Sequence, residues 1–199
     1  NYSALEPLEC IYRGKKISVP YAAAWESYDG GCAEIILDYC PENVDAIVEL
    51  GSGWGLRLAE LWLRGAPKHV PYYGCEFTKN GRSCLEKLSG VESDFQAVSV
   101  DFDYHNPDLS AIRAKFENIF VFSHTSIEQI PNISEKILEE ISSLAKTITC
   151  VHLEPIGWQI REDRNIKNLV GSSREYAEEN DYNRNFWKII QEFSNNDSV

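Results

Sequence analysis

The fold is decided by the stretch Val48-Glu49-Leu50-Gly51-Ser52-Gly53-Trp54-Gly55, which joins a short apolar run to a helical pattern. The run Ala46–Leu50 has the length and composition of a buried strand, and Leu56–Arg64 spaces its leucines and tryptophan as a helix does. Three glycines at alternate positions let the backbone turn sharply and let a ligand approach without meeting a Cβ. This strand–loop–helix context predicts a ligand-binding turn; the alternative is a tight turn that binds nothing.

Short apolar runs alternate with helical patterns along the rest of the chain. The predicted strands are Ala46–Leu50, Tyr72–Glu76 and residues 95–100, 118–123 and 148–153; the predicted helices between them are Leu56–Arg64 and residues 80–88 and 134–145. This alternation implies right-handed crossovers and a parallel sheet. We therefore predict an α/β fold with a Rossmann-like, doubly wound, mainly parallel sheet and helices on both faces. Ligands in such sheets bind beyond the carboxyl ends of the strands.

One domain is expected, with residues 1–44 as a lead-in segment and residues 45–199 as the core. A helix is predicted over residues 28–39, and the small and aromatic residues at 18–27, which include Trp25, are expected to fold over a pocket. After the last strand we expect a loop over residues 155–171, followed by helices at Arg174–Glu179 and residues 185–193.

Composition excludes several classes of protein. Of the 199 residues, 43% are hydrophobic, which is enough for a core, and no apolar run approaches the length of a membrane span. The formal charge of −12 repels phosphate backbones, so we expect no nucleic-acid partner. The six cysteines show no CxxC spacing, and we expect free thiols in a reducing, cytoplasmic setting.

Acidic residues follow the strands that come after the glycine-rich turn. Glu76 ends one predicted strand and Asp101 follows the next. Either could be a solvated loop acid, but together two carboxylates at neighbouring strand ends can hold a ribose diol and an exocyclic amine. Glu49, just before the turn, would favour a cationic ligand.

The glycine spacing is G-x-G-x-G with Leu56 at the sixth position, and it departs from the G-x-G-x-x-G/A of nicotinamide dehydrogenases. Together with the two acids, it resembles motif I and the following strand ends of the class I S-adenosylmethionine-dependent methyltransferases, over residues 45–153. The resemblance implies S-adenosyl-L-methionine as cofactor, with Glu76 on the ribose hydroxyls, Phe77 against the adenine and Asp101 on the adenine amino group. The other cofactor-binding residues that we expect are Glu49, Gly51, Ser52, Gly53, Gly55, Phe102 and Ser123.

The run from Ser123 to Pro131 follows the fourth predicted strand, where such enzymes face the methyl group and the acceptor. Its first seven residues, Ser123 to Gln129, are similar to stretches in bacterial sugar O-methyltransferases. An alcohol acceptor needs a base, and histidine is the side chain best matched to neutral pH, so His124 is the candidate general base. His124 could instead orient the cofactor or cap the helix. Glu128 is a second catalytic candidate, as a group that orients His124 or binds acceptor hydroxyls; the alternative is a helix first-turn acid.

Polar and aromatic residues also follow the fifth predicted strand. His152 is a further catalytic candidate or, alternatively, a core histidine. Glu154 and Trp158, with Trp25 near the N-terminus, are the expected substrate-binding residues, since Trp faces stack on sugar rings. Asp101, Asp103, Glu128 and Glu154 could supply oxygens to a divalent cation, but no spacing is diagnostic and no metal is predicted.

The predicted function is methyl transfer to a small-molecule or glycan acceptor, at a hydroxyl oxygen. Two alternatives remain: a nucleotide-dependent oxidoreductase on the same sheet, and a non-catalytic methyltransferase-like module of a larger assembly. The family's sheet ends in two further strands, for which the sequence after residue 153 has no pattern, so either those strands lie outside the given sequence or the domain is a shortened variant. The absence of methionine and the start at Asn1 lead us to expect part of a longer protein. Another domain or a second copy is expected to cover the sheet edge.

Overall fold

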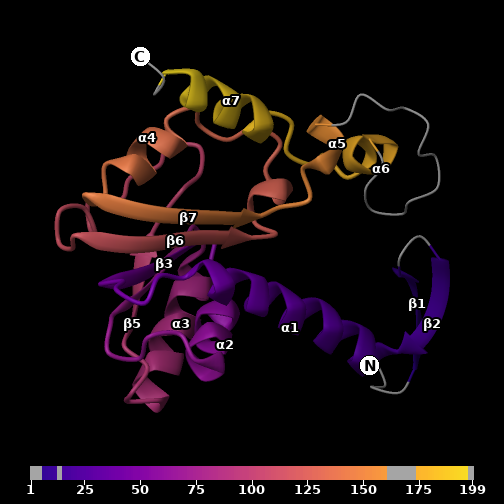
Figure 1. The fold of residues 1–199 in the computed structure, drawn as a ribbon, viewed down its shortest axis with the longest axis horizontal. Coiled ribbons are helices and arrows are strands. Elements are labelled where there is room, and N and C mark those ends of the chain that lie inside the picture. Colours follow the sequence, from indigo (N-terminus) through magenta and orange to yellow (C-terminus); the bar gives the residue numbers. More distant parts are fainter. Residues whose placement is uncertain (1–5, 13–14, 161–173, 197–199) are drawn as a thin grey trace.

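The computed structural model describes residues 6–12, 15–160 and 174–196. Its centre is a five-stranded sheet in which every pairing is parallel, in the order β5-β4-β3-β6-β7 (Figure 1). The strands are β3 (Ala46–Leu50), β4 (Tyr72–Glu76), β5 (Ala97–Asp101), β6 (Asn118–His124) and β7 (Thr147–Leu153). The Rossmann-like fold class is therefore confirmed.

Helices cover both faces of the sheet, as Figure 1 shows. One face carries α1 (Tyr21–Tyr39), α2 (Leu56–Arg64) and α3 (Lys79–Val91), and the other carries α4 (Ile137–Ser142) and α7 (Phe186–Asn196). Because side chains alternate along a strand, the two faces bury different residues. Ile47 and Phe120 pack with α1–α3, whereas Val48 and Val121 pack with α4 and α7.

The bounds of β3, α2 and β4 are those predicted, and the other core strands differ by one or two residues. The helix α4 is shorter than the predicted helix over residues 134–145, and Ile137 and Ile141 are its buried residues. Between β7 and α7 the described residues include two short helices, α5 (Gly157–Ile160) and α6 (Arg174–Glu179), so a helix occupies part of the predicted 155–171 loop. Residues 161–171 of that predicted loop lie outside the described residues.

The N-terminal part differs from the prediction. The helix α1 begins seven residues earlier than the predicted residue 28, and it is preceded by an antiparallel hairpin of β1 (Pro7–Tyr12) and β2 (Lys15–Pro20). Figure 1 shows this hairpin at the far end of α1, away from the sheet. Thus the stretch at residues 18–27 contributes the end of β2 and the first turns of α1. In the described part of the chain, no helix has the length and apolar character needed to cross a membrane.

Candidate functional site

A cavity of about 600 Å³ opens at the carboxyl ends of the strands, beside the place where the strand order reverses between β3 and β6. This is where open α/β sheets bind their ligands. Its walls come from α1, the β3–α2 turn, the ends of β4 and β5, and the loop after β6. The predicted site residues that line it are Trp25, Glu49, Gly51, Ser52, Gly53, Glu76, Phe77, Phe102 and His124.

The glycine-rich turn has the backbone that its sequence requires. Gly51, Gly53 and Gly55 have φ values of 71°, 55° and 87°, all in the left-handed region that side chains disfavour. A Cβ on Gly51 would collide with Ser126, and one on Gly55 would collide with Leu85. At Gly53 a Cβ would meet nothing within 4 Å. Gly53 thus leaves space on the cavity side, whereas Gly55, which is not in the lining, is needed for packing.

Glu49 lines the cavity and is almost fully buried. Its Oε2 atom has no hydrogen-bond partner. Burial raises the pKa of the carboxyl well above its usual range, with a smaller upward contribution from Glu76, while the guanidinium of Arg57 acts in the opposite direction. Burial therefore favours the protonated form of this carboxyl, and a neighbouring positive charge would favour the ionised form.

Glu76, at the end of β4, holds the turn with its carboxylate. Its Oε2 accepts from the backbone N–H of Gly53 at 3.0 Å, and its Oε1 accepts from the N–H and hydroxyl of Thr78 at 2.8 and 2.6 Å. A carboxylate has about four acceptor positions, so these three bonds leave room for one more donor. Glu76 can both fix the Gly53 turn and accept from a ligand hydroxyl.

The neighbouring strand ends supply aromatic walls. Phe77 is 66% exposed and Phe102 is buried, and both line the cavity. Asp101 lies outside the lining: its side chain is 75% exposed and pairs with Arg82, whose Nη1 lies 2.7 Å from Asp101 Oδ1.

His124 ends β6 and faces the cavity from the α1–α2 side of the sheet. Its Nε2 atom is buried without a hydrogen-bond partner, and its ring lies 6.0 Å from that of Tyr28. Burial, and after it the nearby positive charge of Arg57, lower its pKa to about 4. The imidazole is therefore neutral at physiological pH and can accept a proton, although at this pKa it is a weak base.

Asp29 and Arg57 are cavity-lining residues that the sequence analysis did not single out. The Arg57 guanidinium donates from Nη2 to Asp29 Oδ1 at 2.7 Å, and this ion pair joins α2 to α1. The same guanidinium also pairs with Glu60 of α2. A signal for Arg57 was present, because it lies four residues before the buried Leu61, on the apolar face of its helix. Asp29 is likewise four residues before the buried Ala33.

Unpaired buried polar atoms gather in this cavity. Among the described residues, five buried side-chain nitrogen or oxygen atoms have no hydrogen-bond partner: Glu49 Oε2, Ser52 Oγ, Arg57 Nε, Trp62 Nε1 and His124 Nε2. All but Trp62 belong to residues that line the cavity. Such groups are costly unless a partner satisfies them, so their convergence is what a polar ligand site requires.

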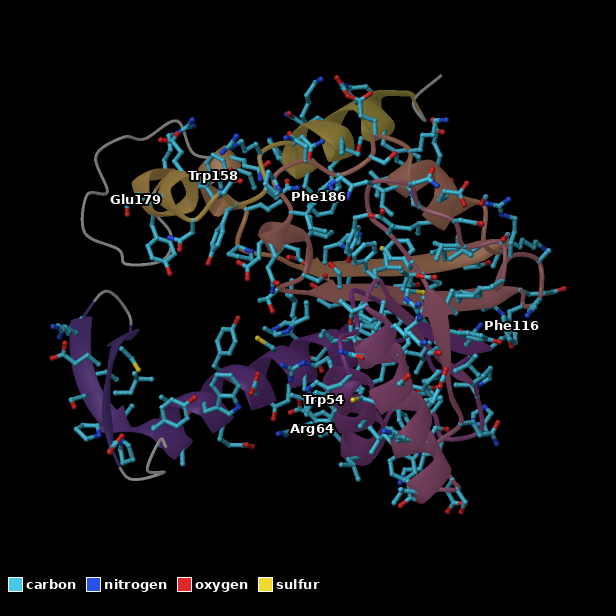
Figure 2. The ribbon with its side chains drawn as sticks, turned by 180° about the vertical axis from the view of Figure 1, so that it is seen from behind. Trp54, Arg64, Phe116, Trp158, Glu179 and Phe186 are labelled. Carbon is cyan, nitrogen blue, oxygen red and sulfur yellow. The ribbon has the colours of Figure 1, made fainter. Side chains whose placement is uncertain are left out.

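Several predicted site residues do not line the cavity: Gly55, Asp101, Ser123, Glu128, His152, Glu154 and Trp158. His152 and His124 lie on opposite faces of the sheet. His152 pairs with Ser123 on the adjacent strand, so these two side chains share a face, and His124, the next residue along β6, points to the other face. The His152 ring packs edge-on against Phe186 of α7, which Figure 2 shows on the opposite side of the sheet from Trp54. Trp158 lies under the Arg174 guanidinium, beside α6 (Figure 2).

Glu128 lies in a short 3-10 turn, η1 (Ile127–Gln129), next to the cavity wall. Burial, and after it the charge of Glu154, raise its pKa to about 7. The loop after β6 thus carries an ionisable carboxyl at Glu128, between the lining residues Ser126 and Gln129. No cluster of three or more His, Cys, Asp or Glu side chains suited to a metal ion occurs in the described ranges.

Known proteins are similar to this chain in structure but not in sequence families. No protein-family model matches it, and no curated protein does. It is similar to the structure of coclaurine N-methyltransferase bound to N-methylheliamine and SAH, with 11% identity, a TM-score of 0.48, and coverage of 63% of this chain and 35% of that chain.

Two further structures are similar at the same level. The N-terminal domain of EvdMO1, in the presence of SAH and D-fucose, has 13% identity and a TM-score of 0.47, with 73% of this chain and 56% of that chain covered. A SAM-dependent methyltransferase from Aquifex aeolicus has 15% identity and a TM-score of 0.44, with 61% and 62% covered. The chain spans less than two thirds of each of these structures, and the likenesses assign no activity to it.

Proposed function

We propose that this chain binds S-adenosyl-L-methionine in the cavity and transfers its methyl group to a hydroxyl of a small-molecule or glycan acceptor. The observation that carries the proposal is the convergence of unpaired buried polar atoms on a glycine-rich turn at the switch point of the sheet. In its support, the weakly similar structures include proteins crystallised with SAH.

The residues of the cavity fit this cofactor. Glu76 retains acceptor capacity for a ribose hydroxyl, and Phe77 and Phe102 offer flat surfaces for adenine. Gly53 leaves open space where a ligand can approach the backbone. The lining holds three acidic residues, Glu49, Glu76 and Asp29, and one basic residue, Arg57, which pairs with Asp29. A bound sulfonium would favour the ionised form of Glu49, so the cavity favours a sulfonium over a neutral thioether.

The acceptor side of the cavity is formed by α1 and the loop after β6. Trp25 and Tyr28 are each 52% exposed and both line the cavity, with the Trp25 ring stacked on Tyr21. Aromatic faces beside the polar side chains of His124 and Gln129 suit a sugar ring or another flat polyhydroxylated acceptor.

The chemistry divides between the cofactor and the protein. When bound, the sulfonium supplies an electrophilic methyl group, and the protein must align the acceptor with it and remove the hydroxyl proton. His124 is the proposed base, because its Nε2 atom is buried, unpaired and part of the cavity wall. Its low pKa keeps it ready to accept this proton throughout the neutral range.

Calorimetry with S-adenosylmethionine, S-adenosylhomocysteine and NAD tests the cofactor. We expect binding of the first two, no heat with NAD, and unchanged affinity in Glu139→Gln, a matched control at an exposed carboxyl of α4. Failure of both adenosyl ligands to bind, or binding of NAD in their place, would overturn the proposal.

A methyl-transfer screen over sugars, phenols and amines then tests the acceptor and the base. His124→Ala should bind S-adenosylhomocysteine normally but lose at least 100-fold in turnover, as removal of a general base does. The wild-type rate should be level from pH 6 to 8 and fall as the pH approaches 4, because the imidazolium cannot accept a proton. Full turnover in His124→Ala would remove its assignment as base, and methylation of amines alone would remove the hydroxyl acceptor.

A further inference from the structure

A chain of hydrogen bonds runs along the α7 side of the sheet, behind the cavity. Cys150 Sγ lies 3.1 Å from His152 Nε2, and His152 Nδ1 lies 2.9 Å from Ser123 Oγ. The hydroxyl of Ser123, which has no exposed surface, donates to Glu154 Oε1 at 2.6 Å. Residues from β6, β7 and the segment after β7 are thereby joined.

The direction of each bond in this chain follows from the chemistry of its groups. The single hydroxyl proton of Ser123 is used on Glu154, so His152 Nδ1 must be the donor to Ser123 Oγ. A neutral imidazole then accepts at Nε2 from the Cys150 thiol. The partial burial of His152 supports this arrangement, because it lowers the pKa of the imidazole to about 4 and so keeps the ring neutral.

Glu154, at the end of this series of hydrogen bonds, holds the loop after β6. Glu154 Oε1 accepts from the backbone N–H of Ser126 at 3.3 Å, and Oε2 accepts from that of Glu128 at 3.1 Å. One side chain from the segment after β7 therefore fixes two amides of a loop that lines the cavity.

Ser126 passes this constraint on to the glycine-rich turn. Its hydroxyl donates to the carbonyl oxygen of Leu50 at 3.0 Å and accepts from Tyr104 at 2.9 Å. A Cβ on Gly51 would overlap Ser126, so the two loops are in direct contact. Between His124 and Ser126, Thr125 has φ of 47°, which is unfavourable for a β-branched residue and needs support from its surroundings.

We propose that Glu154, held by Ser123 and His152, is a positioning residue that fixes the loop of residues 125–130 and so sets the shape of the cofactor cavity at Gly51. This role differs from a contact with the substrate, and its link to the cofactor rests on the proposed function. Glu154→Gln is the sharpest variant, because a side-chain amide has one oxygen where the carboxylate has two. In either orientation, its NH₂ group faces the backbone N–H of Ser126 or that of Glu128, and that N–H loses its acceptor.

Amide hydrogen exchange measured by NMR tests the hold on the loop without any ligand. In Glu154→Gln, the protection of the Ser126 or Glu128 amide should fall at least 10-fold, while that of Val121 in the middle of β6 stays unchanged. Ser123→Ala, which removes the hydroxyl that anchors Glu154, should produce a smaller loss at the same amides, and keeps the test available if Glu154→Gln fails to fold. The control Glu139→Gln should change neither.

Calorimetry with S-adenosylhomocysteine tests the consequence for the cavity, with an expected loss of about 10-fold in affinity in Glu154→Gln. Unchanged loop protection, an equal loss at Val121, or unchanged affinity despite a freed loop would each overturn the proposal. If the wild-type protein itself does not bind S-adenosylhomocysteine, the proposed function fails, and the exchange measurement still decides whether Glu154 holds the loop.

Discussion

At the scale of single residues, the alternation of side chains along the strands decides which chemical groups meet. Glu49, Glu76 and His124 all project to the α1–α3 side of the sheet, where they line one cavity. His152 projects to the other side and packs on Phe186. A shift of one residue in register would exchange these roles, because every side chain would change faces.

Glu49→Gln should stabilise the ligand-free protein at neutral pH and weaken cofactor binding. The raised pKa of Glu49 means that the folded protein holds this proton to higher pH than the unfolded chain, whose value is near 4.5. The stabilisation is therefore complete below pH 4.5 and is lost as the pH rises through the folded pKa. Glutamine avoids that loss, so we expect a melting temperature about 2–4 °C higher at pH 8, the effect of about 1 kcal/mol in a domain of this size.

At pH 4 the variant should have the melting temperature of the wild type, because Glu49 and the glutamine that replaces it are both uncharged. It should weaken S-adenosylmethionine more than S-adenosylhomocysteine, because only the former is cationic. Thermal melts at both pH values and two titrations check this; a lower melting temperature at pH 8 would contradict it.

At the scale of elements, the core of the sheet was predictable and its N-terminal attachments were not. Every residue of Ala46–Leu50 and Tyr72–Glu76 is buried. Both are short, mainly apolar segments bounded by turn residues, a pattern that is typical of strands buried on both faces of a sheet. The hairpin of Pro7–Tyr12 and Lys15–Pro20 has no such pattern, because its described positions are largely exposed. It is recognisable only from its pairing.

Two substitutions in the β3–α2 turn should separate folding from binding. Gly53→Ala places a methyl group in open space, so its cost is the left-handed backbone alone, about 1–2 kcal/mol. Gly55→Ala adds a collision with Leu85 and should cost about 3–4 kcal/mol. Urea denaturation measures both costs, and calorimetry should show that folded Gly53→Ala has lost affinity for S-adenosylhomocysteine. Equal costs for the two variants would argue against this account of the turn.

The ion pair of Asp29 in α1 with Arg57 in α2 should contribute to the free energy of unfolding. Asp29→Ala leaves the buried guanidinium of Arg57 with Glu60 as its remaining acidic partner, and we expect a loss of about 3 kcal/mol, the lower end of the range for breaking a buried ion pair. The control is Asp38→Ala at an exposed position of the same helix, which should stay within about 0.5 kcal/mol of the wild type. Urea denaturation compares them, and a similar loss in both would show that the pair contributes little.

At the scale of the whole molecule, the formal charge is −12, and only a few of the acidic residues belong to the cavity or to the loop contacts described above. Glu49, Glu76 and Asp29 line the cavity, and Glu154 is held by neighbouring hydrogen-bond donors. In the part of the chain that the structure describes, most of the other acidic residues are exposed and repel one another.

The melting temperature should therefore rise with ionic strength. Between 20 and 300 mM salt the screening of this repulsion should add a few degrees, and NaCl and KCl should act alike because the effect comes from ionic strength. Melting curves in both salts test this. A melting temperature that falls with salt would mean that attractive ion pairs outweigh the repulsion.

The sequence by itself determined the parallel sheet, the glycine-rich turn and the strand ends at which the site lies, because periodicity and glycine spacing are local properties of the chain. It did not determine which polar residues share the cavity. Asp29 meets Arg57 across two helices, and Glu154 reaches from the segment after β7 to the loop after β6. Those meetings depend on helix rotation and on strand register between distant segments, which only tertiary packing sets.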